Sequence, residues 1–277
     1  MKVGLSACSN GHSEQWASQV DELCQVLNDM NIEAVKAEHI MCITDEFSGT
    51  DAERAEDLMK FYQDDTIEAI YDISGGDLDN GVLKYLDFET IKKSDKTFWG
   101  YSDLTTVINA IYSQTGKESV LFQVKNMVYS ASELQQKRFA DYINGNNNEL
   151  FNINYEFLQG QSMEGVMVGG DIRCFTKLAG TKYFPDVTGK ILMLEAYGGE
   201  SGQIATLFTQ LEQMGVFEKV AGIMLGTFTA YECANLQMSV FDLLKMHIPE
   251  GLPVAKTNDI GHGHDSKAVV IGRYYRF

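Results

Sequence analysis

The sequence is poor in positive charge. Its 277 residues include 22 lysines and arginines against 39 aspartates and glutamates, which gives a formal net charge of −17. A field of this sign repels the phosphate backbone of nucleic acids and the headgroups of anionic membranes. We therefore expect no nucleic acid and no membrane among its partners. A small anionic substrate would need a locally positive pocket, and the sequence does not show where such a pocket lies.

Paired cysteines are also missing. The five cysteines are odd in number, and no two of them have C-x-x-C spacing. This pattern argues against a disulfide framework and a zinc ribbon, and it is typical of a reducing compartment. No run of residues is long and apolar enough to span a bilayer. Leu5-Ser6-Ala7-Cys8 has the form of a lipoprotein processing site, but almost no apolar region precedes it. We expect a cytoplasmic protein.

Apolar patterning in the first half predicts alternating strands and helices. Short apolar runs predict strands at residues 2–7, 32–35, 67–73 and 97–100. Apolar residues at helical spacing predict amphipathic helices at residues 13–30, 50–64 and 104–112. This alternation is typical of an α/β fold with a doubly wound, mainly parallel sheet. Such sheets bind ligands at the carboxyl ends of their strands.

A polar stretch separates this half from the rest of the chain. Residues 130–164 contain a polar helix and then the run Asn144-Gly145-Asn146-Asn147-Asn148, which is typical of a domain boundary. Beyond it, alternating strands and helices resume. We predict an N-terminal α/β domain at residues 1–150 and a smaller C-terminal β/α domain at residues 165–277.

One serine lies between a predicted strand and a predicted helix. In Gly100-Tyr101-Ser102-Asp103-Leu104, the hydroxyl of Ser102 would stand on a sharp turn beside the free N–H groups of a helix start. Serine and aspartate at this position are more often N-caps, and by itself the segment favours that role. Leu104 stands where the second glycine of a G-x-S-x-G elbow would be, so an ordinary α/β-hydrolase elbow is not supported.

Three further segments hold residues suited to catalysis. Gly75-Gly76 follow a predicted strand and could bring backbone N–H groups to a ligand, although a plain tight turn is the simpler interpretation. Glu195 ends an apolar strand, with Glu200 as a nearby rival. His262 and His264 lie in a glycine-rich loop, and no further cysteine or histidine completes a metal site beside them. Serine, then glutamate, then histidine is the chain order of α/β triads, although role rather than order defines a triad.

At these residues the sequence resembles the LD-carboxypeptidase family of serine peptidases, which includes murein tetrapeptide LD-carboxypeptidases and microcin C immunity peptidases. The resemblance covers nearly the whole chain, and its most specific match is Gly100-Tyr101-Ser102-Asp103-Leu104-Thr105. Other matching blocks are Phe47-Ser48-Gly49-Thr50-Asp51, Gly75-Gly76, Gly165-x-x-x-Gly169-Gly170, Ile191-Leu192-Met193-Leu194-Glu195, Gly222-Ile223-Met224-Leu225-Gly226 and Gly261-His262-Gly263.

The resemblance implies a catalytic triad of Ser102, His262 and Glu195. It implies an oxyanion hole made by the backbone N–H groups of Gly76 and Asp103. It also implies a two-domain fold with the active site in the cleft between the domains, no metal, no other cofactor, and commonly a homodimer.

We expect His262, rather than His264, to be the base. Both histidines follow a glycine in the same loop, so their flanking residues must decide. Asp265 adjoins His264 and would favour its charged form, which suits a general base less well.

The leading hypothesis is a serine carboxypeptidase that acts on a small peptide. The resemblance implies hydrolysis of the L–D amide bond before the terminal D-alanine of a murein tetrapeptide. The alternative is a microcin C immunity-type peptidase that cleaves an amide bond between an aspartyl group and a nucleotide. A binding protein without catalysis on the same scaffold is a third possibility. The sequence departs from the family pattern at Asp171, at Ala196 and after Ser119, where a glycine–proline block is usual, and these departures leave the substrate open.

Overall fold

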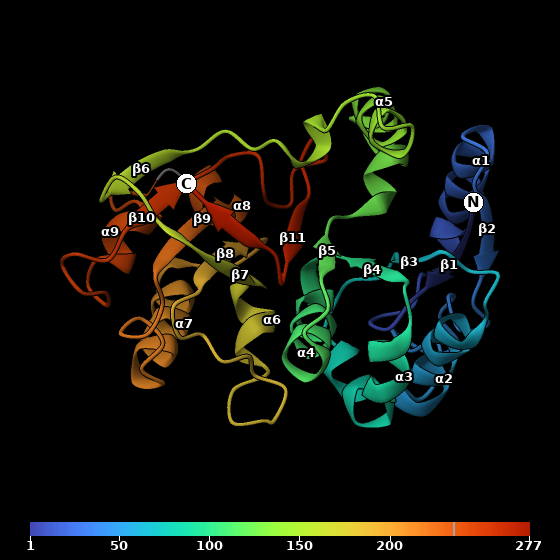
Figure 1. The fold of residues 1–277 in the computed structure, drawn as a ribbon, viewed down its shortest axis with the longest axis horizontal. Helices are drawn as coiled ribbons and strands as arrows, with labels where there is room; N and C mark the ends of the chain where they lie inside the picture. The colour runs from blue at the N-terminus through green and yellow to red at the C-terminus, as the bar shows by residue number, and fades with distance from the viewer. Residues whose placement is uncertain (235) are drawn as a thin grey trace.

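Two β-sheets flanked by helices make up the computed structural model, which describes residues 1–234 and 236–277. Figure 1 shows the two halves side by side, the N-terminal half in blue to green on the right and the C-terminal half in yellow to red on the left. The predicted α/β fold is confirmed. No helix within the described residues has the length and apolar character needed to cross a membrane.

The first sheet is parallel except at one edge. In spatial order its strands are β11 (Val269–Ile271), β5 (Ser119–Leu121), β4 (Thr97–Gly100), β3 (Ala69–Asp72), β1 (Lys2–Ser6) and β2 (Glu33–Lys36). Strand β1 pairs in parallel with both β2 and β3, so the winding reverses there, as in doubly wound sheets. The segments that leave the carboxyl ends of β1, β3 and β4 therefore converge at one edge of the sheet, where such folds bind ligands.

The second sheet has four parallel strands between two antiparallel edges. In spatial order its strands are β12 (Tyr274–Arg276), β7 (Glu164–Asp171), β8 (Ile191–Ala196), β9 (Gly222–Phe228), β10 (Val254–Lys256) and β6 (Glu156–Gln159). The register of β7 and β8 pairs Asp171 with Glu195 at their carboxyl ends. Two acidic residues thus lie side by side at the edge of the sheet that faces the first half.

Helices connect and cover the strands. The α-helices of the described residues are α1 (Ala17–Asp29), α2 (Asp51–Gln63), α3 (Phe88–Lys93), α4 (Thr105–Thr115), α5 (Ser132–Ile143), α6 (Ile172–Thr176), α7 (Ser201–Gln213), α8 (Thr229–Cys233) and α9 (Val240–Leu244). Thr50 begins α2 with a capping box, since the Glu53 N–H donates to Thr50 Oγ1 at 3.3 Å and the Thr50 N–H donates to Glu53 Oε2 at 2.8 Å. Helices α4 and α6 lie in contact between the two sheets (Figure 1).

The strand pairing crosses the predicted domain boundary in two places. Strand β11, near the end of the chain, joins the first sheet antiparallel to β5. Strand β6, within the stretch predicted to separate the domains, pairs with β10 in the second sheet. The next strand after β11 is β12, which returns to the second sheet beside β7. The division at residues 150 and 165 stays a prediction, and the last strands connect both sheets.

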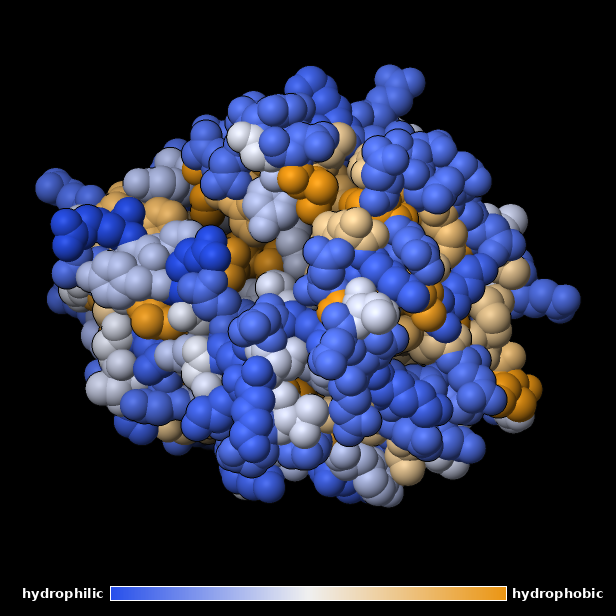
Figure 2. All heavy atoms as spheres, turned by 45° about the vertical axis from the view of Figure 1, so that its right-hand side comes forward, coloured by the Kyte–Doolittle hydropathy of each residue, from blue (hydrophilic) through white to orange (hydrophobic). Residues whose placement is uncertain are grey.

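Apolar side chains fill the layers between the sheets and their helices. In the first half the ring of Trp99 on β4 is buried and packs edge-on against the rings of Tyr71 and Phe139. The face of the molecule in Figure 2 is mainly hydrophilic, and its hydrophobic atoms gather in small areas and within a hollow. The packed layers hold the strand ends, and the loops that follow them, in place.

Candidate active site

Ser102 lies on a strained turn directly after β4. Its φ angle of 57° falls in the left-handed region, which is uncommon for a residue with a side chain and is typical of functional turns. The short 3₁₀ helix η3 (Ser102–Leu104) leads from this turn into α4. Neither helix start has a side-chain cap, so the capping role that the sequence favoured for this segment is not observed.

The hydroxyl of Ser102 faces His262 instead. His262 Nε2 lies 3.1 Å from Ser102 Oγ, and His262 Nδ1 lies 2.8 Å from Glu195 Oε2. Ser102 comes from the first sheet, Glu195 from β8 of the second sheet, and His262 from the loop after β10. The structure therefore brings the three residues of the predicted triad into one hydrogen-bonded line, in the order that a nucleophile, a base and an orienting acid require.

Burial and charge act in opposite directions on His262. Burial of the ring favours its neutral form, but the adjacent Glu195 carboxylate outweighs this effect and raises the pKa of His262 above the usual histidine value. Glu195 is fully buried. Because its carboxylate has left water, Glu195 depends on His262 for compensation, and the two side chains form one electrostatic unit.

The two histidines of the glycine-rich loop have different surroundings. The His262 ring lies between Tyr101 and Tyr197, at centroid distances of 4.9 and 5.1 Å. His264 Nδ1 instead lies 2.7 Å from Ser130 Oγ, and its ring packs on Tyr129. His262 is therefore the histidine beside Ser102, and its role as the base stays a prediction.

The predicted oxyanion residues lie close to Ser102. A Cβ atom at Gly75 would stand 4.0 Å from the Cβ of Ser102, so the glycine turn passes directly beside the serine. Gly76 has a φ of 124°, and a Cβ there would overlap the Asn10 side chain at 2.2 Å, so only glycine fits. The assignment of the Gly76 and Asp103 N–H groups as oxyanion donors remains a prediction.

A cavity of about 670 Å³ opens beside Ser102 and His262. Its wall includes three charged residues that the sequence analysis did not propose as site residues, namely Asp77, Asp171 and Arg173. Asp171 was noted only as a departure from the family pattern. Its carboxylate lies within 4.8 Å of the ligand atoms of Glu195 and His262. The strand register of β7 and β8 is the signal that identifies it, and a single sequence does not reveal register.

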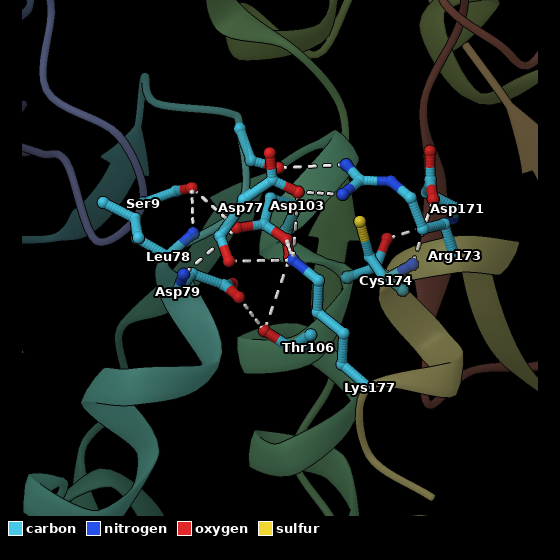
Figure 3. Close-up of polar contacts among 12 residues, drawn as sticks. Ser9, Asp77, Leu78, Asp79, Asp103, Thr106, Asp171, Arg173, Cys174 and Lys177 are labelled. Carbon is cyan, nitrogen blue, oxygen red and sulfur yellow. Dashed lines mark hydrogen bonds and ion pairs between the residues drawn. The ribbon is translucent and has the colours of Figure 1, made fainter. Parts of the chain in front are cut away.

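Ion pairs at Asp77 and Asp103 join the two halves, as Figure 3 shows. The Asp103 carboxylate is fully buried and accepts hydrogen bonds from Ser9 Oγ at 2.6 Å, from the Asp79 N–H at 3.0 Å and from the Lys177 ammonium. Lys177 also donates to the Asp77 carbonyl at 3.0 Å. A cation from the second half thus neutralises the acid that directly follows Ser102.

Arg173 makes a second connection of the same kind. Its guanidinium pairs with the Asp77 carboxylate (Figure 3). It also donates to the Gly76 carbonyl at 3.0 Å. The Asp77 N–H in turn donates to Asn10 Oδ1 at 2.9 Å. The glycine turn beside Ser102 is therefore held from both sides of the cleft.

Two groups of side chains among the described residues have the composition of a metal site. One is Glu38, His39 and Asp57, and the other is Asp171, Glu195 and His262. In the second group, the atoms that a metal would take from Glu195 and His262 are already hydrogen-bonded to each other. A metal bound there would break the hydrogen bond between His262 and Glu195. The expectation of a metal-free reaction stays a prediction.

Comparison with known families bears on this geometry. Residues 3–121 match the model described as the LD-carboxypeptidase N-terminal domain, and residues 164–277 match that of the LD-carboxypeptidase C-terminal domain. The chain belongs to the LD-carboxypeptidase family. Membership makes it a peptidase, and therefore a hydrolase.

The names of the relatives point to two different activities. The chain is 27% identical over 260 residues to the microcin C7 self-immunity protein MccF of Escherichia coli, covering 81% of this chain and 75% of that one. It is 29% identical over 236 residues to a probable murein peptide carboxypeptidase of Bacillus subtilis, covering 81% and 73%. The structure of MccF in complex with aspartyl sulfamoyl adenosine superposes with a TM-score of 0.89 at 21% identity, covering all of this chain and 92% of MccF. That likeness confirms the fold.

Replacing Glu195 with glutamine tests the role of its charge. Glu195→Gln keeps the size of the side chain but removes the carboxylate that raises the pKa of His262. Because neutral His262 would be the base, the acidic limb of kcat/KM should shift to lower pH as this pKa falls. At the plateau, kcat should fall by about 10⁴-fold, as when the acid of a Ser-His-Asp triad is replaced by its amide. The matched control is Glu200→Gln, at the exposed rival acid. An unchanged pH profile for Glu195→Gln, or a shifted one for Glu200→Gln, would contradict the assignment.

Replacing Lys177 tests the ion pair behind the nucleophile. Lys177→Met leaves the buried Asp103 carboxylate without its cation, so the free energy of unfolding should fall by about 3–5 kcal/mol. Urea denaturation followed by the fluorescence of buried Trp99 measures this change, with Trp16 replaced by phenylalanine in every protein. Lys182→Met, at an exposed lysine nearby, should stay within about 0.5 kcal/mol of the parent. Equal stabilities of the two variants would show that the pair is not stabilising.

Removing metal ions tests the acid–histidine group at the site. Dialysis against EDTA should leave kcat and KM unchanged, since Glu195 and His262 use each other as partners. Activity assays before dialysis, after dialysis and after addition of zinc measure the effect. Loss of activity with recovery in zinc would assign Asp171, Glu195 and His262 as ligands and remove the triad interpretation.

Proposed function

We propose that this protein is a serine carboxypeptidase that hydrolyses the L–D amide bond of murein peptides and releases the terminal D-alanine of a tetrapeptide. The observation that carries the proposal is the hydrogen-bonded line from Ser102 through His262 to Glu195. No cofactor enters the reaction as proposed. The alignment of a hydroxyl, an imidazole and a buried carboxylate is the arrangement that activates a serine for attack on an amide carbonyl.

In the proposed reaction, Ser102 Oγ forms a bond to the amide carbon and its proton passes to His262 Nε2. The tetrahedral intermediate then collapses, the C–N bond breaks, and His262 returns the proton to the departing amine. A water molecule repeats the attack on the ester, and Ser102 regains its hydroxyl. Glu195 keeps the imidazole in one orientation and stabilises it while it carries the extra proton.

The negative oxygen of the intermediate requires N–H donors. Asp103 stands at the start of η3, and Gly76 lies on the glycine turn beside Ser102. Backbone donors in fixed positions stabilise such an oxygen without reorganisation during the reaction. The contacts of Arg173 and Lys177 with the glycine turn and with Asp103 support this preorganisation.

The second candidate keeps the mechanism and changes the substrate to an aspartyl group joined to a nucleotide by an amide bond. It is supported by the match to MccF, which is as extensive as the match to the murein peptidase. Asp171 and Ala196, where the sequence departs from the family pattern, line the larger cavity. They could therefore contact the substrate and influence which of the two substrates binds. We favour the murein peptide, and with it a cytoplasmic homodimer that recycles cell-wall fragments.

Substitution of the nucleophile tests the proposal. Wild-type protein should release D-alanine from purified murein tetrapeptide, and Ser102→Ala should lose several orders of magnitude in kcat because the attacking oxygen is gone. Mass spectrometry of the tripeptide and D-alanine measures both. A fluorophosphonate probe should label the wild type and not the variant, whereas a pure binding protein would show no labelling at all.

The control is Ser162→Ala. It removes an exposed hydroxyl that lines neither cavity beside Ser102, so it should behave as wild type. Near wild-type turnover by a folded Ser102→Ala protein would overturn the nucleophile. Aspartyl sulfamoyl adenosine serves as the competing ligand in the same assays. Cleavage of an aspartyl-nucleotide amide, with no release of D-alanine, would establish the second candidate instead.

A further inference from the structure

A second, smaller cavity also borders Ser102 and His262. Its volume is about 230 Å³, against about 670 Å³ for the larger one. Ser102, His262 and Tyr197 line both cavities, so a bond attacked by Ser102 would have one part of the substrate in each. The smaller cavity is otherwise walled by the glycine turn and by the segments around Lys125 and His264.

Lys125 supplies a positive charge to the wall of this cavity. It stands in the 3₁₀ helix η4 (Val124–Val128), in the stretch where the usual glycine–proline block is missing. Its ammonium makes no hydrogen bond or ion pair with any residue that the structure describes. Burial lowers the pKa of Lys125 to about 8, although the charge of Asp72 acts in the opposite direction. Lys125 is therefore mainly protonated at neutral pH, and it is a cation without a direct partner.

Asp72 cannot serve as that partner because its own hydrogen bonds are occupied. Its Oδ2 accepts from Ser6 Oγ at 2.9 Å and from the Cys8 N–H at 2.8 Å. Its Oδ1 accepts from the N–H and the hydroxyl of Ser74, at 2.9 and 2.5 Å. The charge of Asp72 thus acts on the Lys125 ammonium without a hydrogen bond between them. The N–H donors of Lys125 are left for a ligand in the cavity.

The sizes of the two cavities indicate which part of the substrate each one takes. In a carboxypeptidase the leaving group is a single amino acid, whereas the acyl part is the rest of the peptide. Sites for ligands of drug size measure about 300–1,000 Å³, a range that includes the larger cavity and exceeds the smaller one. Gly76, the proposed oxyanion donor, lines only the larger cavity, whereas the neighbours of His262 in its loop, Gly261, Gly263 and His264, line only the smaller one. The smaller cavity therefore suits the leaving amino acid, whose amine receives its proton from His262.

We propose that Lys125 binds the terminal carboxylate of the leaving amino acid and so restricts cleavage to the C-terminal residue. This inference rests on the proposed function, because it assigns the leaving-group side of the same reaction. A carboxylate satisfies a half-buried ammonium, while a C-terminal amide or a continuing chain leaves it unpaired, which is costly away from water. The preference for a free C-terminal carboxylate thus arises from the charge of Lys125, which the carboxylate neutralises.

The first test compares a murein tetrapeptide with its C-terminal amide. Wild-type protein should prefer the free acid in kcat/KM by about 10- to 100-fold, the effect of one hydrogen bond between charged groups. Lys125→Met should lower kcat/KM for the acid by the same factor and leave the amide unchanged. Lys125→Arg should keep the preference because it keeps the charge. Lys137→Met, at an exposed lysine, should match wild type.

The second test measures binding without turnover, so it separates this inference from the proposed function. Ser102→Ala protein is titrated by calorimetry with the same two peptides, with and without Lys125→Met. Tighter binding of the acid that Lys125→Met abolishes supports the inference, even if the wild type releases no D-alanine and the proposed function falls. Equal binding of acid and amide, or a preference that survives Lys125→Met, overturns it. Failure to bind either peptide, or Lys125-dependent binding of aspartyl sulfamoyl adenosine alone, overturns it as well.

Discussion

The hydrogen bonds of His262 connect groups that belong to different sheets. Ser102 stands at the carboxyl end of a strand in the first sheet, and Glu195 stands at the carboxyl end of a strand in the second. Neither sheet alone holds both the Ser102 hydroxyl and the Glu195 carboxylate. The distances of 3.1 and 2.8 Å exist only while the two sheets keep one relative position. An error of about 1 Å between them would disturb the alignment of the reacting groups.

The other features of the cleft can be understood as means of keeping that position. Lys177 and Arg173 on or next to α6 reach across to Asp103 and Asp77 on the loops of the first sheet. Strand β11 places a late part of the chain at the edge of the first sheet. Of these contacts, the Lys177–Asp103 pair neutralises a fully buried carboxylate, so its loss would cost stability and geometry together.

The fold was predictable because it depends on local order in the sequence, whereas the grouping of Ser102, His262 and Glu195 was expected from the resemblance to the family. Alternating apolar runs and helical periodicity identified β1, β3, β4 and their helices, and they predicted the start of α2 to within one residue. Ser102 and Glu195 follow strands, so their place at a strand end could be deduced. Propensity alone favoured an N-cap in the segment of Ser102. The resemblance of this segment to the family pattern favoured a catalytic serine instead.

Long-range pairing was not predictable from the same signals. The place of Asp171 beside Glu195 depends on the register of β7 and β8, and a single sequence carries no measure of register. The ion pairs of Arg173 and Lys177 depend on how one half meets the other. Strand β11 has only three residues, and its apolar pattern suits either sheet equally well. Local propensity carries little information about contacts between distant parts of a chain.

The connection made by β11 has a consequence for the order in which the chain can fold. The outer edge of β5 receives its partner from residues 269–271, which follow all the parallel strands of the second sheet in the sequence. Domains of a growing chain usually fold in order of synthesis, but here the first sheet stays open at one edge until residues 269–271 have been made. A chain truncated before residue 269 would therefore expose an unpaired edge of β5, and one truncated before residue 262 would also hold Ser102 without the histidine beside it.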